Sequence, residues 1–315
     1  MIELDKSEVK HLLEALRNNR TSGASELINN ALEIINVQLE LTQDRNMNIT
    51  EEIYPLFKKI IDSRTTMAPL INCIGYLLHD LSTITKNNLE KRIKQFKNKE
   101  NERKKALECN FREFLKEREK NLKRIMLISY GSSILNVLQK NSDFDFEIIV
   151  LESRPLLEGR ITAKLLSKYF KTSLIIDAAM GKFIEQVDLV LIGVDSILRD
   201  GAIINKIGTY PLAALAKLNN IDLFAIGDSF KYNLRSHYGY KVIIEKKLSS
   251  EVFELSEDLN MDVLNYYFEL IPSKYISGII SDLGIMTIQE FIEKVKNLLP
   301  IEWFNYFLND KESSN

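Results

Sequence analysis

The spacing of the apolar residues changes near residue 124, and this change limits the possible folds more than any other feature. Before it, apolar residues recur every three or four positions, as on one buried face of a helix. After it, short apolar runs alternate with helical spacing, the pattern of a parallel sheet with helices on both faces. The sequence therefore predicts an α/β protein, with a helical N-terminal domain (1–123) followed by a Rossmann-like parallel-sheet domain (124–315).

Five helical segments are expected in the first part, over residues 8–19, 23–43, 48–63, 66–82 and 89–124. The last carries 14 Lys and Arg against 7 Glu, a charge run that could contact RNA or phosphate groups. No aromatic platform for bases accompanies this charge, so we interpret the segment as a solvated helix packed on the others. Its apolar stripe comprises Leu89, Ile93, Phe96, Leu107, Phe111 and Leu115.

Six strands are expected in the second part, over residues 124–130, 146–152, 172–177, 189–194, 222–227 and 240–246. In open parallel sheets, ligands bind beyond the carboxyl ends of the strands. The polar residues at these ends are Tyr130, Glu152, Asp177, Asp195 and Asp228. The sequence therefore predicts a ligand pocket where these side chains meet.

Composition excludes several classes of protein. No apolar stretch reaches the roughly 18 residues of a membrane span, so we expect no membrane contact and a cytoplasmic location. The two cysteines and three histidines are scattered without metal-ligand spacing, so neither a metal nor another cofactor is expected. A net charge of −2 gives no sign of direct nucleic-acid binding.

Three groups of polar residues are candidates for a site, and each has a plainer interpretation. The amides at Gly131 and Ser132 could cradle a phosphate or form a simple turn, and Arg154 could bind phosphate or make a structural ion pair. Asp195 could cap a helix or move a proton on a ligand, with Asn205 and Lys206 binding that ligand from the next helix start. Spacing alone leaves these alternatives open.

Six motifs in this order resemble one superfamily: TSGAS, RTTMAPLIN, ESRPLLEGRITAKLL, GVDSI with DGAIINKIGT, GDSFKYN, and FELIPSKYISGIISDLG. The superfamily comprises the alpha, beta and delta subunits of translation initiation factor 2B, methylthioribose-1-phosphate isomerase and ribose-1,5-bisphosphate isomerase. The resemblance covers nearly the whole chain. It implies that Asp195 is the family's acid, that Asn205 and Lys206 bind the ligand, and that Arg64 contacts phosphate.

The chain departs from the isomerase pattern at several positions. Tyr130 stands where the isomerases have a cysteine, and Glu158 stands where they have a substrate-binding glutamine. The TSGAS motif resembles the family's R-G-A loop in part: it keeps Gly23 and Ala24 but has Ser22 in place of the arginine. Tyrosine has a reference pKa near 10 and is a poor base at neutral pH, so these changes argue against isomerisation.

Two functions therefore compete, and we favour the first at this point. One is a non-catalytic regulatory subunit resembling initiation factor 2B alpha, which would bind a sugar phosphate or nucleoside monophosphate and contact initiation factor 2 through its alpha subunit. The alternative is a sugar-phosphate aldose–ketose isomerase, which would make the chain an enzyme. The resemblance and the apolar stretch YISGIISDLGIM also predict a homodimer, or a higher oligomer, built on the C-terminal domain.

Overall fold

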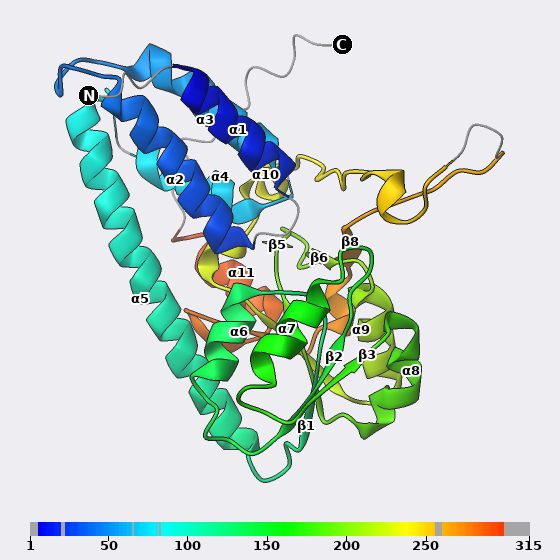
Figure 1. The fold of residues 1–315 in the computed structure, drawn as a ribbon. Coiled ribbons are helices and arrows are strands. Elements are labelled where there is room, and N and C mark those ends of the chain that lie inside the picture. Colours follow the sequence, from blue (N-terminus) through cyan, green and yellow to red (C-terminus); the bar gives the residue numbers. More distant parts are fainter. Residues whose placement is uncertain are drawn as a thin grey trace.

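The computed structural model describes residues 6–19, 23–64, 66–79, 81, 83–255 and 260–298. Helices α1 to α4 gather at one end of the molecule, and the strands with their covering helices form the other end (Figure 1). The long helix α5 runs beside both (Figure 1). Over the described part of the chain, no helix combines the length and apolar character needed to cross a membrane.

The first part of the chain is helical, as predicted. Between residues 6 and 118, the described residues contain no strand. Helix α4 is the most central of these helices, because nearly all of its residues are buried. The helices are α1 (Lys6–Asn18), α2 (Ala24–Glu40), α3 (Thr50–Ser63), α4 (Ala68–Leu78) and α5 (Lys86–Arg118).

Helix α5 contributes to two hydrophobic clusters, and its predicted apolar stripe is confirmed as buried. Near its start, Leu89, Ile93 and Phe96 pack with the N-terminal helices. Near its end, Phe111 and Phe114 pack against the sheet, where the Phe114 ring meets Phe224 at 4.7 Å between centroids. The domain boundary predicted at residue 123 remains a prediction. Helix α5 precedes that residue but packs both with the N-terminal helices and against the sheet that follows.

The main sheet, over the described residues, has seven strands in the order β10-β9-β7-β4-β1-β2-β3. All neighbours pair in parallel except β9 and β10. Five of the six predicted strands are confirmed. The strands are β1 (Arg124–Leu127), β2 (Glu147–Leu151), β3 (Thr172–Ile175), β4 (Leu189–Gly193), β7 (Asp222–Ile226), β9 (Gly278–Ser281) and β10 (Gly284–Met286).

Both faces of this sheet are covered, which explains why its central strands are continuous apolar runs. On β1, Ile125 and Leu127 pack in one cluster, whereas Met126 and the following Ile128 pack in the other. The first cluster includes side chains of α5, α6 (Ser132–Gln139) and α7 (Glu158–Leu166). The second includes side chains of α8 (Met180–Phe183), α9 (Thr209–Leu218), α11 (Ile288–Val295) and the N-terminal helices.

A second, smaller sheet was not predicted. It consists of β5 (Ser196–Ile197), β6 (Ile203–Lys206) and β8 (Phe268–Ile271), paired antiparallel. Asn205 and Lys206 lie on β6, so their predicted place at a helix start is wrong. The partner strand β8 lies far along the chain, and local spacing carries no information about such a pairing.

The strand predicted over residues 240–246 is wrong. This segment belongs to an extended arm that projects from the sheet (Figure 1), and it forms only one isolated bridge, from Lys246 to Tyr266. Its alternation of apolar and polar residues resembles a strand, yet Ile243 is 68% exposed. The stretch YISGIISDLGIM behaves in the opposite way, because Ile279 and Ile280 are fully buried within the main sheet. Among the large apolar side chains of this stretch only Ile285 is exposed, at 36%, so the stretch supplies less free apolar surface than expected.

Short elements complete the described fold. Two of them, η3 and α10, follow β7 and lead into the arm. These elements are η1 (Asp177–Ala179), η2 (Ile184–Gln186), η3 (Ser229–Lys231), α10 (Leu234–His237), η4 (Ser249–Glu251) and η5 (Ser273–Tyr275).

Candidate functional site

A pocket lies at the carboxyl ends of the strands, where the strand order reverses between β1 and β4. The chain runs outward from β1 to β2 and β3 in one direction, and from β4 to β7 in the other. A reversal of this kind opens a crevice between the two sets of loops. Part of the pocket is open to solvent.

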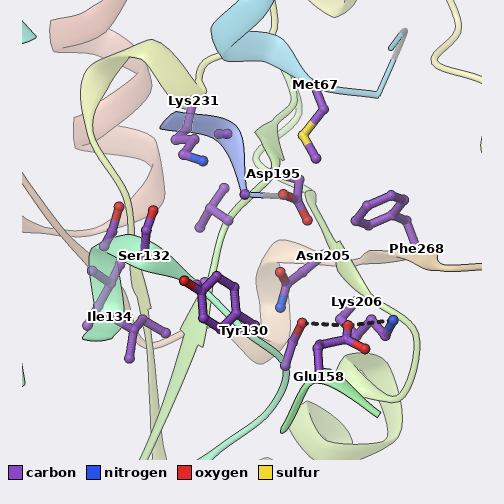
Figure 2. A pocket seen from close by; sticks show the side chains of 18 of the residues that line it. Met67, Tyr130, Ser132, Ile134, Glu158, Asp195, Asn205, Lys206, Lys231 and Phe268 are labelled. Atoms are coloured by element: carbon purple, nitrogen blue, oxygen red, sulfur yellow. Dashed lines mark hydrogen bonds and ion pairs between the residues drawn. The ribbon is translucent and has the colours of Figure 1, made fainter. Parts of the chain in front are cut away.

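Most of the predicted site residues line this pocket. Figure 2 shows Tyr130, Glu158, Asp195, Asn205 and Lys206 around the same hollow, although they come from four different segments. The predicted residues in the lining are Gly23, Ala24, Tyr130, Gly131, Ser132, Glu158, Asp195, Asn205 and Lys206. Ser22 lies outside the described residues.

Two helices begin at the wall of the pocket. Gly23 precedes α2 and Gly131 precedes α6, and neither helix start has a side-chain cap. The two starts are close, because a Cβ built on Gly23 would lie 3.6 Å from Ser132 Oγ. The first amides of a helix lack partners within the helix, and its dipole favours an anion there. This wall can therefore receive a phosphate group.

A buried ion pair forms the opposite side of the pocket. Lys206 Nζ lies 2.5 Å from Glu158 Oε1, and the two side chains are only 3% and 10% exposed. Ser129 Oγ donates to the same Glu158 oxygen at 3.0 Å, while Oε2 has no hydrogen-bond partner. The charge of Glu158 is thus compensated by Lys206, which removes the repulsion of phosphate expected from an unpaired acid.

The loops after β1 and β2 hold this ion pair with an unusual backbone. Ser129, Ser153 and Leu157 have φ values of 73°, 65° and 60°, in the left-handed region that such residues seldom adopt. Two hydrogen bonds lock the loops together: Ser129 N donates to Ser153 Oγ at 2.7 Å, and Ser153 N donates to Asp177 Oδ1 at 2.8 Å. Strained backbone of this kind is typical of functional sites.

Asp195 is the carboxyl group most suited to move a proton. Burial raises the pKa of Asp195 to about 6, an effect opposed by the charges of Lys231 and Lys206 and reinforced by Glu158. Its backbone N–H donates to the Ile204 carbonyl at 3.0 Å, so Asp195 joins the edge of the small sheet and caps no helix. An acid with this pKa accepts and releases protons near neutral pH.

The structure also places a second cation, Lys231, in the pocket, and we did not predict it. Its side chain lines the pocket beside Asp195 and is 9% exposed (Figure 2). It follows β7, so its position beyond a strand end was a signal that could have found it. The aromatic lining from Tyr267 and Phe268 had no such signal, because the arm and β8 deliver it.

Hydrogen bonds of buried polar side chains join the segments that form the pocket. Ser196, next to Asp195, donates its hydroxyl to the Thr66 carbonyl at 2.5 Å and accepts from Ala68 N at 3.2 Å. Asn72 donates to the carbonyls of Phe230 and Tyr232 at 2.6 and 2.8 Å. The helical part of the chain therefore helps to place both Asp195 and Lys231.

Five predicted residues do not line the pocket: three acids at strand ends, Glu152, Asp177 and Asp228, and two arginines, Arg64 and Arg154. Arg64 is buried, with an exposure of 8%, and burial lowers the pKa of Arg64 while Glu245 and Tyr267 act to raise it. Its Nε has no hydrogen-bond partner. Arg154 is exposed, and its backbone N–H donates to Asp177 Oδ2 at 2.7 Å. Neither of the two alternatives predicted for the Arg154 side chain appears among the described contacts.

The arrangement combines anion binding with one proton-transferring group. Two helix starts and Lys231 favour phosphate, while Lys206 compensates the charge of Glu158. Asn205 offers hydrogen bonds to hydroxyl groups, and Asp195 can act as acid or base. Within the described ranges, no cluster of three or more His, Cys, Asp or Glu residues could hold a metal ion.

Comparisons with known proteins identify a family and several similar proteins. The model of the Initiation factor 2 subunit family matches residues 7–288. The ribose 1,5-bisphosphate isomerase of Archaeoglobus fulgidus is 29% identical over 88% of this chain and 89% of its own length, and that of Pyrococcus furiosus is 27% identical over 89% and 90%. The crystal structure of translation initiation factor eIF-2B from Pyrococcus horikoshii OT3 has a TM-score of 0.77 and 25% identity, covering 91% of this chain and all of that one.

Proposed function

The chain belongs to the initiation factor 2 subunit family, and from this premise we propose that its pocket binds a phosphorylated sugar and catalyses aldose–ketose isomerisation. The observation that carries the proposal is Asp195, a carboxyl group with a pKa of about 6 beside two lysines. The names of the two isomerase relatives support it as well. This choice reverses the preference drawn from the sequence, which rested on the missing cysteine.

The reaction moves one hydrogen from C2 of the sugar to C1 and breaks the bond between C1 and the ring oxygen. The ring oxygen takes up the proton that the C2 hydroxyl loses, and C2 becomes a carbonyl. The reaction needs a base for the C2 proton, which then returns it to C1, and Asp195 would serve as that base. It also needs a hydrogen-bond donor for the oxygen that gains charge. A tyrosine hydroxyl supplies such a donor in other enolising enzymes, so Tyr130 would take this role although it is a poor base.

We expect the protein to convert ribose 1,5-bisphosphate to the corresponding ketose, with a rate that rises with pH through about 6 as Asp195 loses its proton. Asp195→Asn should lower the rate by about 10²–10⁴-fold, the usual contribution of a positioned acid–base group. NMR spectroscopy of the reaction mixture measures the product. Asp200→Asn, an acid in the exposed turn outside the pocket, is the matched control and should keep the wild-type rate.

A second candidate is the regulatory function favoured from the sequence, supported by Tyr130 at the position of the isomerase cysteine. In that case the sugar phosphate, or a nucleoside monophosphate, would bind without reacting, and the protein would contact initiation factor 2. Binding of ribose 1,5-bisphosphate in calorimetry, with no ketose formed over hours, would favour this candidate over the isomerase.

We also propose a homodimer formed through the arm, residues 240–255 and 260–266, in place of the buried stretch first considered. The arm exposes large apolar side chains, including Ile243 at 68%, Leu248 at 54% and Leu264 at 66%. Isolated monomers seldom expose so many apolar residues together.

Light scattering should therefore give about twice the 36.4 kDa of one chain at micromolar concentration. Replacing Ile243 and Leu264 together by Ser should shift the mass toward one chain, because it removes apolar contact area. The control pair, Leu218→Ser with Ile176→Ser, lies outside the arm and is similarly exposed at 78% and 60%. A monomer in the unaltered protein would disprove the dimer.

A further inference from the structure

The turn that carries Lys231 is held from one side by Asp282, in the tight turn between β9 and β10. Asp282 Oδ1 accepts from Ser229 N at 2.6 Å, and Oδ2 accepts from Ser229 Oγ at 2.8 Å. Both oxygens of one carboxylate thus bind the first residue of η3, which ends at Lys231. A double contact of this kind fixes the orientation of the turn as well as its distance.

Arg103 of helix α5 holds the same turn from another side. Its guanidinium lies 3.7 Å from the centre of the Phe230 ring, and its Nε lies 3.8 Å from Asp228 Oδ2. Burial and the charge of Asp228 raise the pKa of Asp282 to about 6, and Ser229 and Arg103 oppose this. The positive charge of Arg103 therefore interacts with the carboxyl groups of both Asp228 and Asp282.

Lys231 itself makes no comparable contact. Within the described part of the chain, its ammonium group has no hydrogen bond and no ion pair within 4 Å, although the residue is 9% exposed. The backbone of the turn is bound by Asp282 and Asn72, and Arg103 contacts the ring of Phe230. The position of the ammonium group therefore depends on how the turn is held, and not on partners of its own.

We propose that Asp282 and Arg103 are positioning residues, which hold the Ser229–Lys231 turn so that the Lys231 ammonium group stays in the pocket beside Asp195. Neither residue lines the pocket. The expected effect on sugar-phosphate affinity rests on the proposed function, whereas the expected effect on the placement of Lys231 does not.

The placement can be measured by trace labelling with acetic anhydride, followed by mass spectrometry of the peptide that contains Lys231. In Asp282→Ala, the turn is released, and we expect Lys231 to react about fivefold faster than in the wild-type protein. Asp188→Ala is the matched control, because Asp188 Oδ2 also accepts from two backbone amides, Lys123 N at 2.7 Å and Arg124 N at 2.8 Å, at the other end of the sheet. It should leave the labelling rate of Lys231 unchanged.

The affinity can be measured by calorimetry with ribose 5-phosphate. Lys231→Ala should weaken binding about tenfold or more, as the loss of a charged hydrogen bond does. Asp282→Ala should weaken binding about fivefold in the wild-type background, but less than twofold when Lys231 is already Ala. Asp282→Asn keeps the size of the side chain and one oxygen acceptor, so it should fold even if the alanine variant does not, and weaken binding about threefold.

The outcomes separate this inference from the proposed function. Unchanged labelling of Lys231 in Asp282→Asn and Asp282→Ala, or an equal change in Asp188→Ala, would overturn the positioning role. An equal loss of affinity with and without Lys231 would overturn it as well. Altered labelling with no binding of ribose 5-phosphate to the wild-type protein would support the positioning role and count against the proposed function.

Discussion

Lys206→Met should lower the free energy of unfolding by about 3–5 kcal/mol, the range found when one partner of a buried ion pair is removed. The variant would leave the Glu158 carboxylate without its cation, in a site where one of its oxygens already lacks a hydrogen bond. Urea denaturation followed by circular dichroism measures the change. This pair is the most buried one among the described ion pairs, so no other single charge removal should have a larger effect.

Two further variants make the test specific. The double variant Lys206→Met with Glu158→Gln should recover most of the lost stability, since it leaves no charge uncompensated. Lys116→Met breaks an exposed pair with Glu113 and should change stability by less than about 1 kcal/mol. Equal losses for Lys206→Met and Lys116→Met would contradict a special contribution of the buried pair to stability.

Gly159→Ala should also be strongly destabilising, by about 3 kcal/mol or more, at the upper end of the range for overpacking. A Cβ at this position would lie 1.8 Å from the Leu151 carbonyl oxygen, so helix α7 would have to move away from strand β2. That movement would displace Glu158, the neighbouring residue, and with it the ion pair to Lys206. Thermal and urea unfolding would report the loss.

Gly181→Ala is the matched control for this variant. Gly181 lies in the short helix α8, and nothing lies within 4 Å of a Cβ built there. Alanine favours a helix over glycine, so this variant should be as stable as the wild type or slightly more so. A Gly159→Ala protein of wild-type stability would mean that α7 can shift freely against β2.

The sequence was sufficient to predict those elements in which the local spacing of apolar residues matches the residues that are buried. Strand β4 and all of β1 after Arg124 are apolar because both of their faces are covered. Tyr130 and Asp195 follow these strands, at the end of a parallel sheet where ligands bind. Residues 240–246 show the limit of this reasoning, since an exposed arm can alternate apolar and polar residues as a strand does.

The rest of the site depends on contacts between distant segments. Asn205 and Lys206 are placed by the pairing of β6 with β8, and Lys231 by a turn that Asn72 and Asp282 bind from other parts of the fold. The pairing of Glu158 with Lys206 likewise brings together α7 and β6. None of these contacts leaves a trace in local spacing, so a single sequence could name the residues without arranging them.

Helix α5 also limits where this chain can be joined to a segment of a related protein. Phe111 and Phe114 cover the sheet, whereas Leu89 and Phe96 pack with the N-terminal helices. If residues 1–123 were replaced by those of a related protein, helix α5 of that protein would pack against the native sheet. Such a chimera would carry mismatched shapes along one whole face of its core. An exchange near Glu100 would keep Phe111 and Phe114 with the sheet that they cover. A segment boundary for such an exchange is therefore better placed within helix α5 than after it.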